Sequence, residues 1–450
     1  MKPDARRVAW DILCQVESAK SSDLVLERAL SATDLSPLDR AFITELVYGV
    51  LRRRGYLDWV IGRFAARDRQ RQSVKLKNLL RLGSYQLLFL NRVPPSAAVD
   101  ESVRLAKTFG GKAVAGFVNA VLRALTRAET IPLPDPSDDP VFHISVKYSH
   151  PQWLVKRWLR RLGPERTIAL CVGNNEIPPV TVRVNSLRTT REALAAGLKG
   201  EGIEVTPCRV SSSGLMLRGV ADLRQLPAYR RGDFYVQDEA AQLVGFIVAP
   251  KTGDHLLDAC AAPGGKSTHL AELMGDRGEI TAADADPKRL ERIAQNASRL
   301  GLGSVRPIAV DASRSLEALG KVLYDRILVD APCSGLGILR RNPEAKWYKN
   351  ETAIGKMAAL QLSILDRVAP RLKPGGVLVY STCTTEPEEN EDVIGAFLGG
   401  HRDFRIDSLR TAWSETPELA TPEGYLSTLL NPYQMDHFFV AKLIKPSKGE

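Results

Sequence analysis

The stretch Asp258–Leu270, DACAAPGGKSTHL, carries the signal that decides the fold. The apolar run HLLDACA, which starts at His255, predicts a short buried strand. Ala261–Gly265 carry little side-chain bulk and predict a turn, and GKSTHLAELMG has the spacing of a helix. Backbone N–H groups at the start of such a helix can approach an anionic or polar ligand. The stretch therefore predicts one strand–turn–helix unit of an α/β sheet with a ligand site at the turn.

Four further runs downstream repeat this pattern: EITAADA, VRPIAVDA, DRILVDAPC and GVLVYSTC, beginning at Glu279, Val305, Asp325 and Gly376. Helical stretches separate them, and strands alternating with helices predict a parallel, doubly wound, Rossmann-like sheet. We place this α/β domain at residues 232–446. In such sheets the ligand lies beyond the carboxyl ends of the strands.

Seven chemically active side chains end or follow these predicted strands: Asp258, Cys260, Asp284, Asp311, Asp330, Cys333 and Cys383. A lone cysteine in such a place is usually a small buried apolar residue, but three on one rim beside four carboxylates indicate a site. Asp284 is placed to bind the ribose hydroxyls of a nucleoside cofactor, and Asp311 the amino group of its base. A phosphate loop is rejected, because the first glycine of GxxxxGK[ST] would fall at Cys260.

The rest of the chain divides by composition. Residues 1–129 contain successive amphipathic segments and predict an all-α domain. Residues 130–141 include TIPLPDPSDDPV, a proline-rich linker. Residues 142–231 mix helix and short strands and predict a small α+β domain. RNA binding and a role as packing adaptor remain equally open for that domain.

The overall composition is that of a globular protein, with 450 residues, 44% hydrophobic and 25% charged. The absence of a long apolar run or signal peptide favours a cytoplasmic location and no membrane contact, and monomer is the default. The six cysteines form no CxxC pair, so no metal site is expected. The net charge is +10, which favours a polyanionic partner. Ten basic residues between Arg52 and Arg81 predict either a phosphate-binding face or a solvated helical face.

Three motifs together, DACAAPGGKSTHL, DAPCSGLGILRRNPEAKW and VYSTCTTEPEEN, resemble those of the Sun/Fmu family of RNA cytosine-5 methyltransferases. The helical N-terminal third resembles NusB, and the combination is similar to the B type that acts on small-subunit (16S) ribosomal RNA. The resemblance implies S-adenosyl-L-methionine as cofactor and RNA as partner. The cofactor-binding residues that it implies are Cys260, Ala261, Ala262, Pro263, Gly264, Gly265, Lys266, Asp284, Asp311 and Asp330.

The resemblance also assigns catalytic roles: Cys383 as nucleophile, Cys333 in release of the product, and Asp330 on the N3/N4 edge of cytosine. A thiolate that adds to C6 makes C5 nucleophilic, which explains why this reaction uses cysteine. Lys266 is expected to lower a thiol pKa. Arg183 and Asn185 match a family position, with a structural role as the alternative. His437 stands where the family usually has glycine, which we interpret as a tolerated change at a turn before the last strand.

Three other functions remain as alternatives. These are the same chemistry on transfer RNA, a non-catalytic RNA-binding or antitermination factor that keeps the fold, and a nucleotide hydrolase.

Overall fold

The computed structural model describes residues 4–19, 21–65, 72–220, 222–411 and 415–447. The chain forms two compact units. Unit 1 comprises Met1–Ile177 and Leu339–Asn350, and unit 2 comprises Pro178–Ile338 and Glu351–Glu450. Each unit is described by itself.

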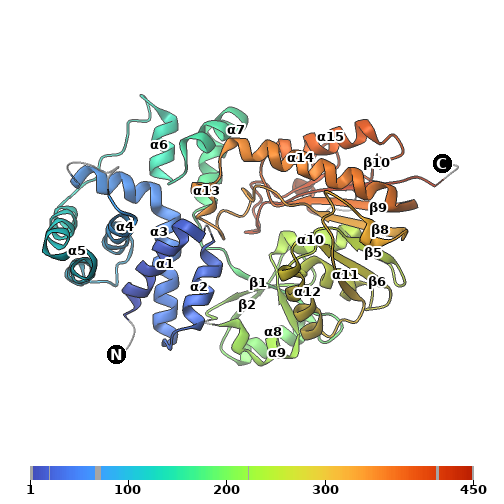
Figure 1. Cartoon of the computed structure of the whole chain (residues 1–450), viewed down its shortest axis with the longest axis horizontal. Coiled ribbons are helices and arrows are strands. Elements are labelled where there is room, and N and C mark those ends of the chain that lie inside the picture. The colour runs from blue at the N-terminus through green and yellow to red at the C-terminus, as the bar shows by residue number, and fades with distance from the viewer. Residues whose placement is uncertain (1–3, 20, 66–71, 221, 412–414, 448–450) are drawn as a thin grey trace. The chain divides into compact units, whose positions relative to one another are not determined.

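Unit 1 is helical in its described part (Figure 1). Its helices are α1 (Ala5–Ala19), α2 (Ser22–Ser31), α3 (Pro37–Phe64), α4 (Val74–Phe89), α5 (Pro95–Thr126), α6 (Pro140–Lys147), α7 (Gln152–Gly173) and α13 (Ala345–Tyr348). The start of α3 follows from its sequence, because Ser36 caps the amide of Asp39 and Pro37 occupies the first turn. Leu46, Leu79 and Val118 lie fully buried in the shared core of α3, α4 and α5.

Two parts of unit 1 differ from the domain boundaries read in the sequence. Helices α6 and α7 group with the N-terminal helices, whereas we placed residues from 142 onward in the α+β domain. The apolar side of α6 packs against α3, and Trp158 of α7 is fully buried. The segment Leu339–Asn350, which the sequence places in the sheet domain, also belongs to unit 1. Within it, Glu344 accepts hydrogen bonds of 2.8 Å from both the amide and the hydroxyl of Ser22.

Unit 2 contains a small antiparallel sheet of strand order β2-β3-β1-β4. Its elements are β1 (Val180–Val184), α8 (Arg191–Gly200), β2 (Glu204–Pro207), β3 (Gly214–Arg218), the 3-10 turn η2 (Leu223–Gln225), α9 (Pro227–Arg231) and β4 (Phe234–Val236). Strand β4 pairs with β1, although it lies beyond residue 231, where we ended the α+β domain. A strand of three residues is too short to show an alternating pattern, and only its pairing reveals it.

The larger sheet of unit 2 has the order β10-β12-β9-β8-β5-β6-β7, and β11 pairs with β12. Its strands are β5 (His255–Asp258), β6 (Glu279–Asp284), β7 (Val305–Ala309), β8 (Tyr324–Asp330), β9 (Leu372–Thr382), β10 (Arg405–Ile406), β11 (Leu426–Ser427) and β12 (Phe439–Ile444). The five strands predicted from the repeated motif, β5 to β9, run parallel as expected. Strand β12 joins β9 antiparallel, so the complete sheet is mixed.

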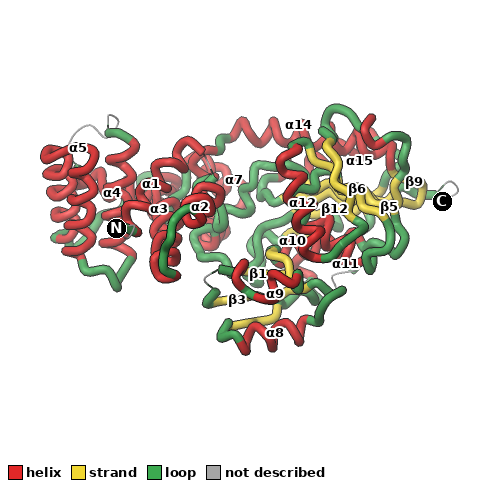
Figure 2. Tube along the Cα trace, turned by 60° about the horizontal axis from the view of Figure 1, so that its bottom comes forward, coloured by secondary structure: helices red, strands yellow, loops and turns green. Residues whose placement is uncertain are grey.

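Helices cover both faces of this sheet (Figures 1 and 2). They are α10 (Glu239–Val248), α11 (Gly265–Leu273), α12 (Pro287–Leu300), α14 (Glu351–Val368) and α15 (Glu391–Gly400), and the 3-10 turns are η3 (Glu317–Leu319), η4 (Ala369–Arg371), η5 (Pro387–Glu389) and η6 (Pro417–Leu419). Neighbouring strand residues face opposite cores: Leu256 packs on the α10–α12 side and Leu257 on the α14–α15 side. The apolar alternation therefore produces the doubly wound Rossmann-like layering that the sequence predicts.

Candidate active site

The carboxyl ends of the parallel strands bring the predicted rim residues to one edge of the sheet. Asp258, Asp284 and Asp330 are the last residues of β5, β6 and β8. The remaining four follow strand ends directly or within three residues: Cys260, Asp311, Cys333 and Cys383. The chain changes direction across the sheet between β5 and β8, where the loops of an open α/β sheet leave room for a ligand.

Two of these cysteines touch. The Sγ atoms of Cys333 and Cys383 lie 3.4 Å apart, although 50 residues separate them in the chain. The hydrogen bond to Cys333, followed by burial, raises the pKa of Cys383 well above its ordinary value. Lys266 lowers this pKa, as the sequence predicts, but its effect is smaller than those two. Cys383 is therefore a protonated thiol in the free protein.

Asp330 connects the cysteine pair to the cofactor loop. Its Oδ2 accepts a 2.7 Å hydrogen bond from Lys266 Nζ, and its Oδ1 accepts one of 2.8 Å from Ser381 Oγ. Burial lowers the pKa of Lys266, but the attraction of Asp330 outweighs it and the pKa is raised. Lys266 is therefore a cation at neutral pH. The Asp330 side chain is 31% exposed, and its carboxylate has lone pairs left for a ligand.

The loop between β5 and α11 is held by neighbouring elements. Ala262 N donates to Asp284 Oδ2 over 3.1 Å, and Ala261 N donates to Ala283 O. Gly264 has a φ of 99°, and a Cβ there would lie 3.2 Å from Cα of Ile293. A Cβ on Gly265 would lie 2.9 Å from the Tyr235 ring. Packing thus requires glycine at both positions. This requirement adds to the sequence prediction that small residues here let a ligand approach the backbone.

The residues around this loop fit a nucleoside cofactor. The first amides of α11 point out of the helix end without acceptors inside the helix. Among the described residues, the buried Oδ1 of Asp258 has no hydrogen-bond partner, while its Oδ2 accepts from Ser267 Oγ over 2.6 Å. Burial, with Asp330 nearby, raises the pKa of Asp258 to about 7. Burial and these carboxylates also raise the pKa of Cys260 well above its usual value, so this thiol stays neutral.

Asp311 is the most open of the four carboxylates. Its Oδ1 accepts from the amide and hydroxyl of Ser313, and its Oδ2 lies 3.2 Å from Arg314 Nε. The Asp311 side chain is 40% exposed, so it keeps access to a ligand at the end of β7.

Arg183 and Asn185 have structural contacts in unit 2. The Arg183 guanidinium is fully buried and pairs with both carboxylate oxygens of Glu272, at 2.9 and 2.8 Å. Asn185 Nδ2 donates to the carbonyls of Gly232 and Leu300, both over 3.0 Å. These contacts join the small sheet to α11 and α12 and favour the structural role that we kept as the alternative.

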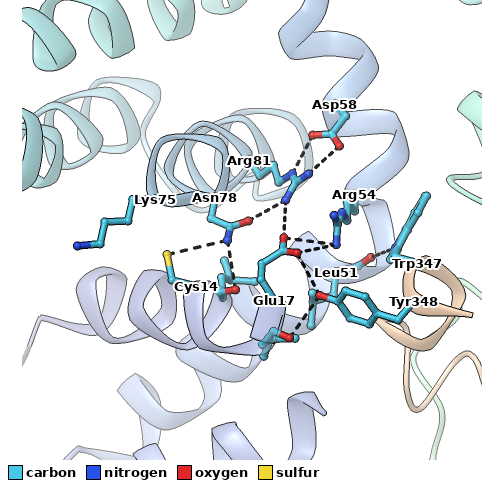
Figure 3. Close-up of polar contacts among 12 residues, drawn as sticks. Cys14, Glu17, Leu51, Arg54, Asp58, Lys75, Asn78, Arg81, Trp347 and Tyr348 are labelled. Carbon is cyan, nitrogen blue, oxygen red and sulfur yellow. Dashed lines mark hydrogen bonds and ion pairs between the residues drawn. The ribbon is translucent and has the colours of Figure 1, made fainter. Parts of the chain in front are cut away.

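Part of the basic run in unit 1 points inward. Figure 3 shows Arg54 and Arg81 directed at Glu17, and Arg81 also pairs with Asp58 at 2.8 Å. Arg52 is buried, whereas Arg63 and Lys75 are exposed. Three further members lie outside the described residues: Arg67, Arg69 and Arg71. The count of ten therefore overstates the charge that unit 1 presents to solvent.

His437 lies in the extended segment before β12, close to the Cys333 loop. Its amide donates to Gly337 O over 3.1 Å, and its ring Nδ1 lies 3.1 Å from Thr428 O. Gly337 N in turn donates to Cys383 O over 2.9 Å, and a Cβ on Gly337 would approach that oxygen to 2.8 Å. The backbone at position 437 thus supports the cysteine loops, a contact that any residue type except proline can make.

Sequence reasoning missed two side chains behind the cysteines, Glu389 and Gln361. Both are buried, and both reach the backbone beside Cys333. The sequence offered one signal for Glu389, the acidic run EPEEN after Cys383. A carboxylate of that run that is buried must have specific hydrogen-bond donors.

The described residues contain no cluster of histidine, cysteine, aspartate and glutamate that could hold a metal ion. In the same part of the chain, every helix is too short or too polar to cross a membrane.

The fold and the sequence matches define a Rossmann-like methyltransferase. Residues 245–444 match the family 16S rRNA methyltransferase RsmB/F, residues 3–127 the NusB family, and residues 150–224 the ferredoxin-like domain of RsmF/B-like methyltransferases. The probable ribosomal RNA small subunit methyltransferase B of Bacillus subtilis (strain 168) is 38% identical over 99% of both chains. The chain therefore belongs to the ribosomal RNA small subunit methyltransferase B family, as its motifs predict.

Two solved structures share the fold of this chain. The crystal structure of PH0851 is 27% identical, with a TM-score of 0.85, covering 99% of this chain and 100% of that one. NSun6 from Pyrococcus horikoshii, solved with SFG, shares the fold at 23% identity and a TM-score of 0.57, covering 66% of this chain and 98% of its own. S-adenosylmethionine, the cofactor that the motifs predict, is the methyl donor of this methyltransferase family.

Proposed function

We propose that this chain transfers a methyl group to C5 of a cytosine in small-subunit ribosomal RNA, through a covalent bond between Cys383 and C6. The observation that carries the proposal is the pair of thiols 3.4 Å apart, beside a carboxylate, at the carboxyl ends of β8 and β9. The curated relatives of this chain are named as ribosomal RNA small subunit methyltransferases, which supports the substrate class.

The cofactor site of this proposal is the loop from Cys260 to Lys266. Asp284, at the end of β6, would accept hydrogen bonds from the ribose hydroxyls, and Asp311 from the amino group of the base. Asp330 would offer a carboxylate to the amino-acid end of S-adenosylmethionine. When bound, S-adenosylmethionine supplies an electrophilic methyl group.

Cys383 performs the attack on the base. Its sulfur bonds to C6, and its proton ends on N3, where Asp330 accepts the new N–H. The raised pKa of Cys383 fits this order of steps, because the thiol keeps its proton until N3 of the bound cytosine can take it. Electron density then rises at C5, which is otherwise too weak a nucleophile for methylation.

Cys333 completes the cycle. After methylation, C5 carries both a methyl group and a proton. The Cys333 sulfur takes this proton and releases its own to solvent. The C5–H electron pair restores the C5–C6 double bond as the C6–S bond breaks, and the proton on N3 returns to Cys383. Removing Cys333 therefore leaves the protein attached to its RNA.

The RNA must present the cytosine outside its stack. Unstacking costs about a few kcal/mol and is easiest in a single-stranded or loop target. The net charge of +10 supports binding of the surrounding phosphates, and we assign this role to the NusB-like and ferredoxin-like parts.

The test uses 5-fluorocytidine-substituted small-subunit ribosomal RNA with S-adenosylmethionine on a denaturing gel. Fluorine cannot leave C5 as a proton does, so the nucleophile stays bonded to the RNA. Wild type and Cys333→Ala should give the adduct, and Cys383→Ala should not.

Loss of the adduct in Cys333→Ala alone would invert the two roles. An adduct with 5-fluorocytidine-substituted transfer RNA, and none with ribosomal RNA, would show that transfer RNA is the substrate. A wild-type protein that binds RNA, but gives neither adduct nor methylated product, would favour the non-catalytic RNA-binding alternative.

A further inference from the structure

A buried carboxylate connects the two cysteine loops. Glu389 is fully buried in the turn η5, six residues after Cys383. Its Oε2 accepts a 2.8 Å hydrogen bond from the amide of Ser334, the residue after Cys333. Its Oε1 accepts one of 3.2 Å from the hydroxyl of Thr384, the residue after Cys383. A single side chain therefore contacts the immediate neighbour of each cysteine.

The hydroxyl groups in this network have a defined direction. Ser334 Oγ and Thr384 Oγ1 lie 2.8 Å apart. An ionised carboxylate only accepts, so the single proton of Thr384 points at Glu389. Ser334 must then donate to Thr384, which makes the chain Ser334 to Thr384 to Glu389 fully ordered. Its order depends on the negative charge of Glu389.

Gln361 on α14 extends the contact to the other side of Cys333. Its Nε2 donates to Glu389 Oε2 and to Pro332 O, both over 3.0 Å. The backbone is thus held at Pro332 O before Cys333 and at Ser334 N after it. Rotation of the Cys333 loop would break one of these two bonds.

The Cys383 loop has a second support of its own. Asn390 Oδ1 accepts from Thr382 Oγ1 over 2.5 Å, and Asn390 Nδ2 donates to Thr384 O over 3.2 Å. These bonds bracket Cys383 without passing through the Glu389 carboxylate. Loss of that carboxylate should therefore disturb Cys333 more than Cys383.

Burial of the charged Glu389 carboxylate costs free energy unless its hydrogen-bond donors are kept. It raises the pKa of Glu389, and the bonds from Ser334, Gln361 and Thr384 oppose that rise. All three donors are neutral groups, so the carboxylate is stabilised by directed hydrogen bonds. Such bonds lock the groups that they join, and a pair of reacting groups must be held to within about 0.5 Å of its productive geometry.

We infer that Glu389 and Gln361 are positioning residues that hold Cys333 against Cys383, and that they control release of the methylated base. This inference rests on the proposed function. Displacement of a reacting group by about 1 Å can cost about 100-fold in rate. Glu389→Gln and Gln361→Met should therefore slow release by about 10- to 100-fold while changing attack by Cys383 much less.

The experiment follows the covalent complex with unsubstituted ribosomal RNA and S-adenosylmethionine over time on denaturing gels. Both variants should accumulate the adduct, as Cys333→Ala should, while wild type turns over. The matched control is Asp392→Asn, an exposed carboxyl three residues further on, which should behave as wild type. Cofactor binding by titration calorimetry and the melting temperature verify that each variant is folded.

The outcomes separate this inference from the proposed function. Absence of an adduct between wild type and 5-fluorocytidine RNA would refute the proposed function itself. With that adduct present, release by Glu389→Gln at the wild-type rate would overturn the positioning role. A folded, cofactor-binding Glu389→Gln that forms no adduct would also overturn it, because the residue would then act on the attack by Cys383.

Discussion

Replacing the buried Arg183 by methionine should destabilise unit 2 strongly. The guanidinium makes two bonds to Glu272, one of 2.7 Å to Gly265 O and one of 3.1 Å to Thr268 Oγ1, and it also donates to Gln237. Its side chain is 0% exposed and that of Glu272 is 2% exposed. Removing one partner of such a pair leaves a buried charge without compensation and costs about 3–5 kcal/mol.

The consequence is measurable by calorimetry or urea unfolding. At about 2–4 °C per kcal/mol for a unit of this size, the melting temperature should fall by about 10 °C. The loss should also depend on pH. Burial raises the pKa of Glu272, and Arg183 opposes this rise. Without Arg183, the pKa of Glu272 in the folded protein lies further above its pKa in the unfolded chain. The variant therefore loses stability as the pH rises through the folded-state pKa of Glu272.

Two variants make the test decisive. Arg306 pairs with Glu279 at 3.3 Å, but the side chains are 69% and 44% exposed, so Arg306→Met should cost less than about 1 kcal/mol. Adding Glu272→Met to Arg183→Met should restore part of the stability. Equal losses for Arg183→Met and Arg306→Met would refute the reasoning, because burial would then not determine the cost.

Two further predictions concern single carboxyl groups. The pKa of Asp258 is raised from 3.8 to about 7, so its contribution to stability is complete at acid pH and is lost as the pH rises through about 7. Urea unfolding of wild type and Asp258→Asn should therefore show a difference in stability that moves against wild type between about pH 4 and pH 8; a constant difference would contradict the assignment. In unit 1, Glu344→Ala removes both bonds to Ser22 at the start of α2 and should cost about 1–2 kcal/mol. Ser22→Ala should add little to Glu344→Ala in a double-mutant cycle, and full additivity would show that the two residues act independently.

The sequence predicts the parallel core of the sheet well, because local patterns carry that information. Strands β5, β6, β8 and β9 contain apolar runs whose alternate residues face two cores, and three of these strands end in aspartate. The small sheet was predicted less well. The pairing of β4 with β1 across about 50 residues leaves no local trace in a three-residue strand.

The basic run between Arg52 and Arg81 shows what the sequence could not predict. Arg54 and Arg81 both pair with Glu17 in unit 1 (Figure 3). Arg63 belongs to the same basic run of the sequence, yet it is exposed. Whether a charge faces solvent depends on which carboxylates the neighbouring helices bring to it. Sequence alone counts charges without their partners.

The sequence by itself determined which polar side chains gather at the rim of the sheet. Strand ends are local features, and in a parallel sheet they share one edge, so Asp284, Asp330 and Cys383 could be placed together without coordinates. Only the tertiary structure decided how the two cysteines meet. Their Sγ atoms lie 3.4 Å apart, and Glu389 and Gln361, which lie in different elements, bond to the backbone on either side of Cys333. Hydrogen bonds are short-ranged and directional, so such partners become visible only once packing has brought the elements together.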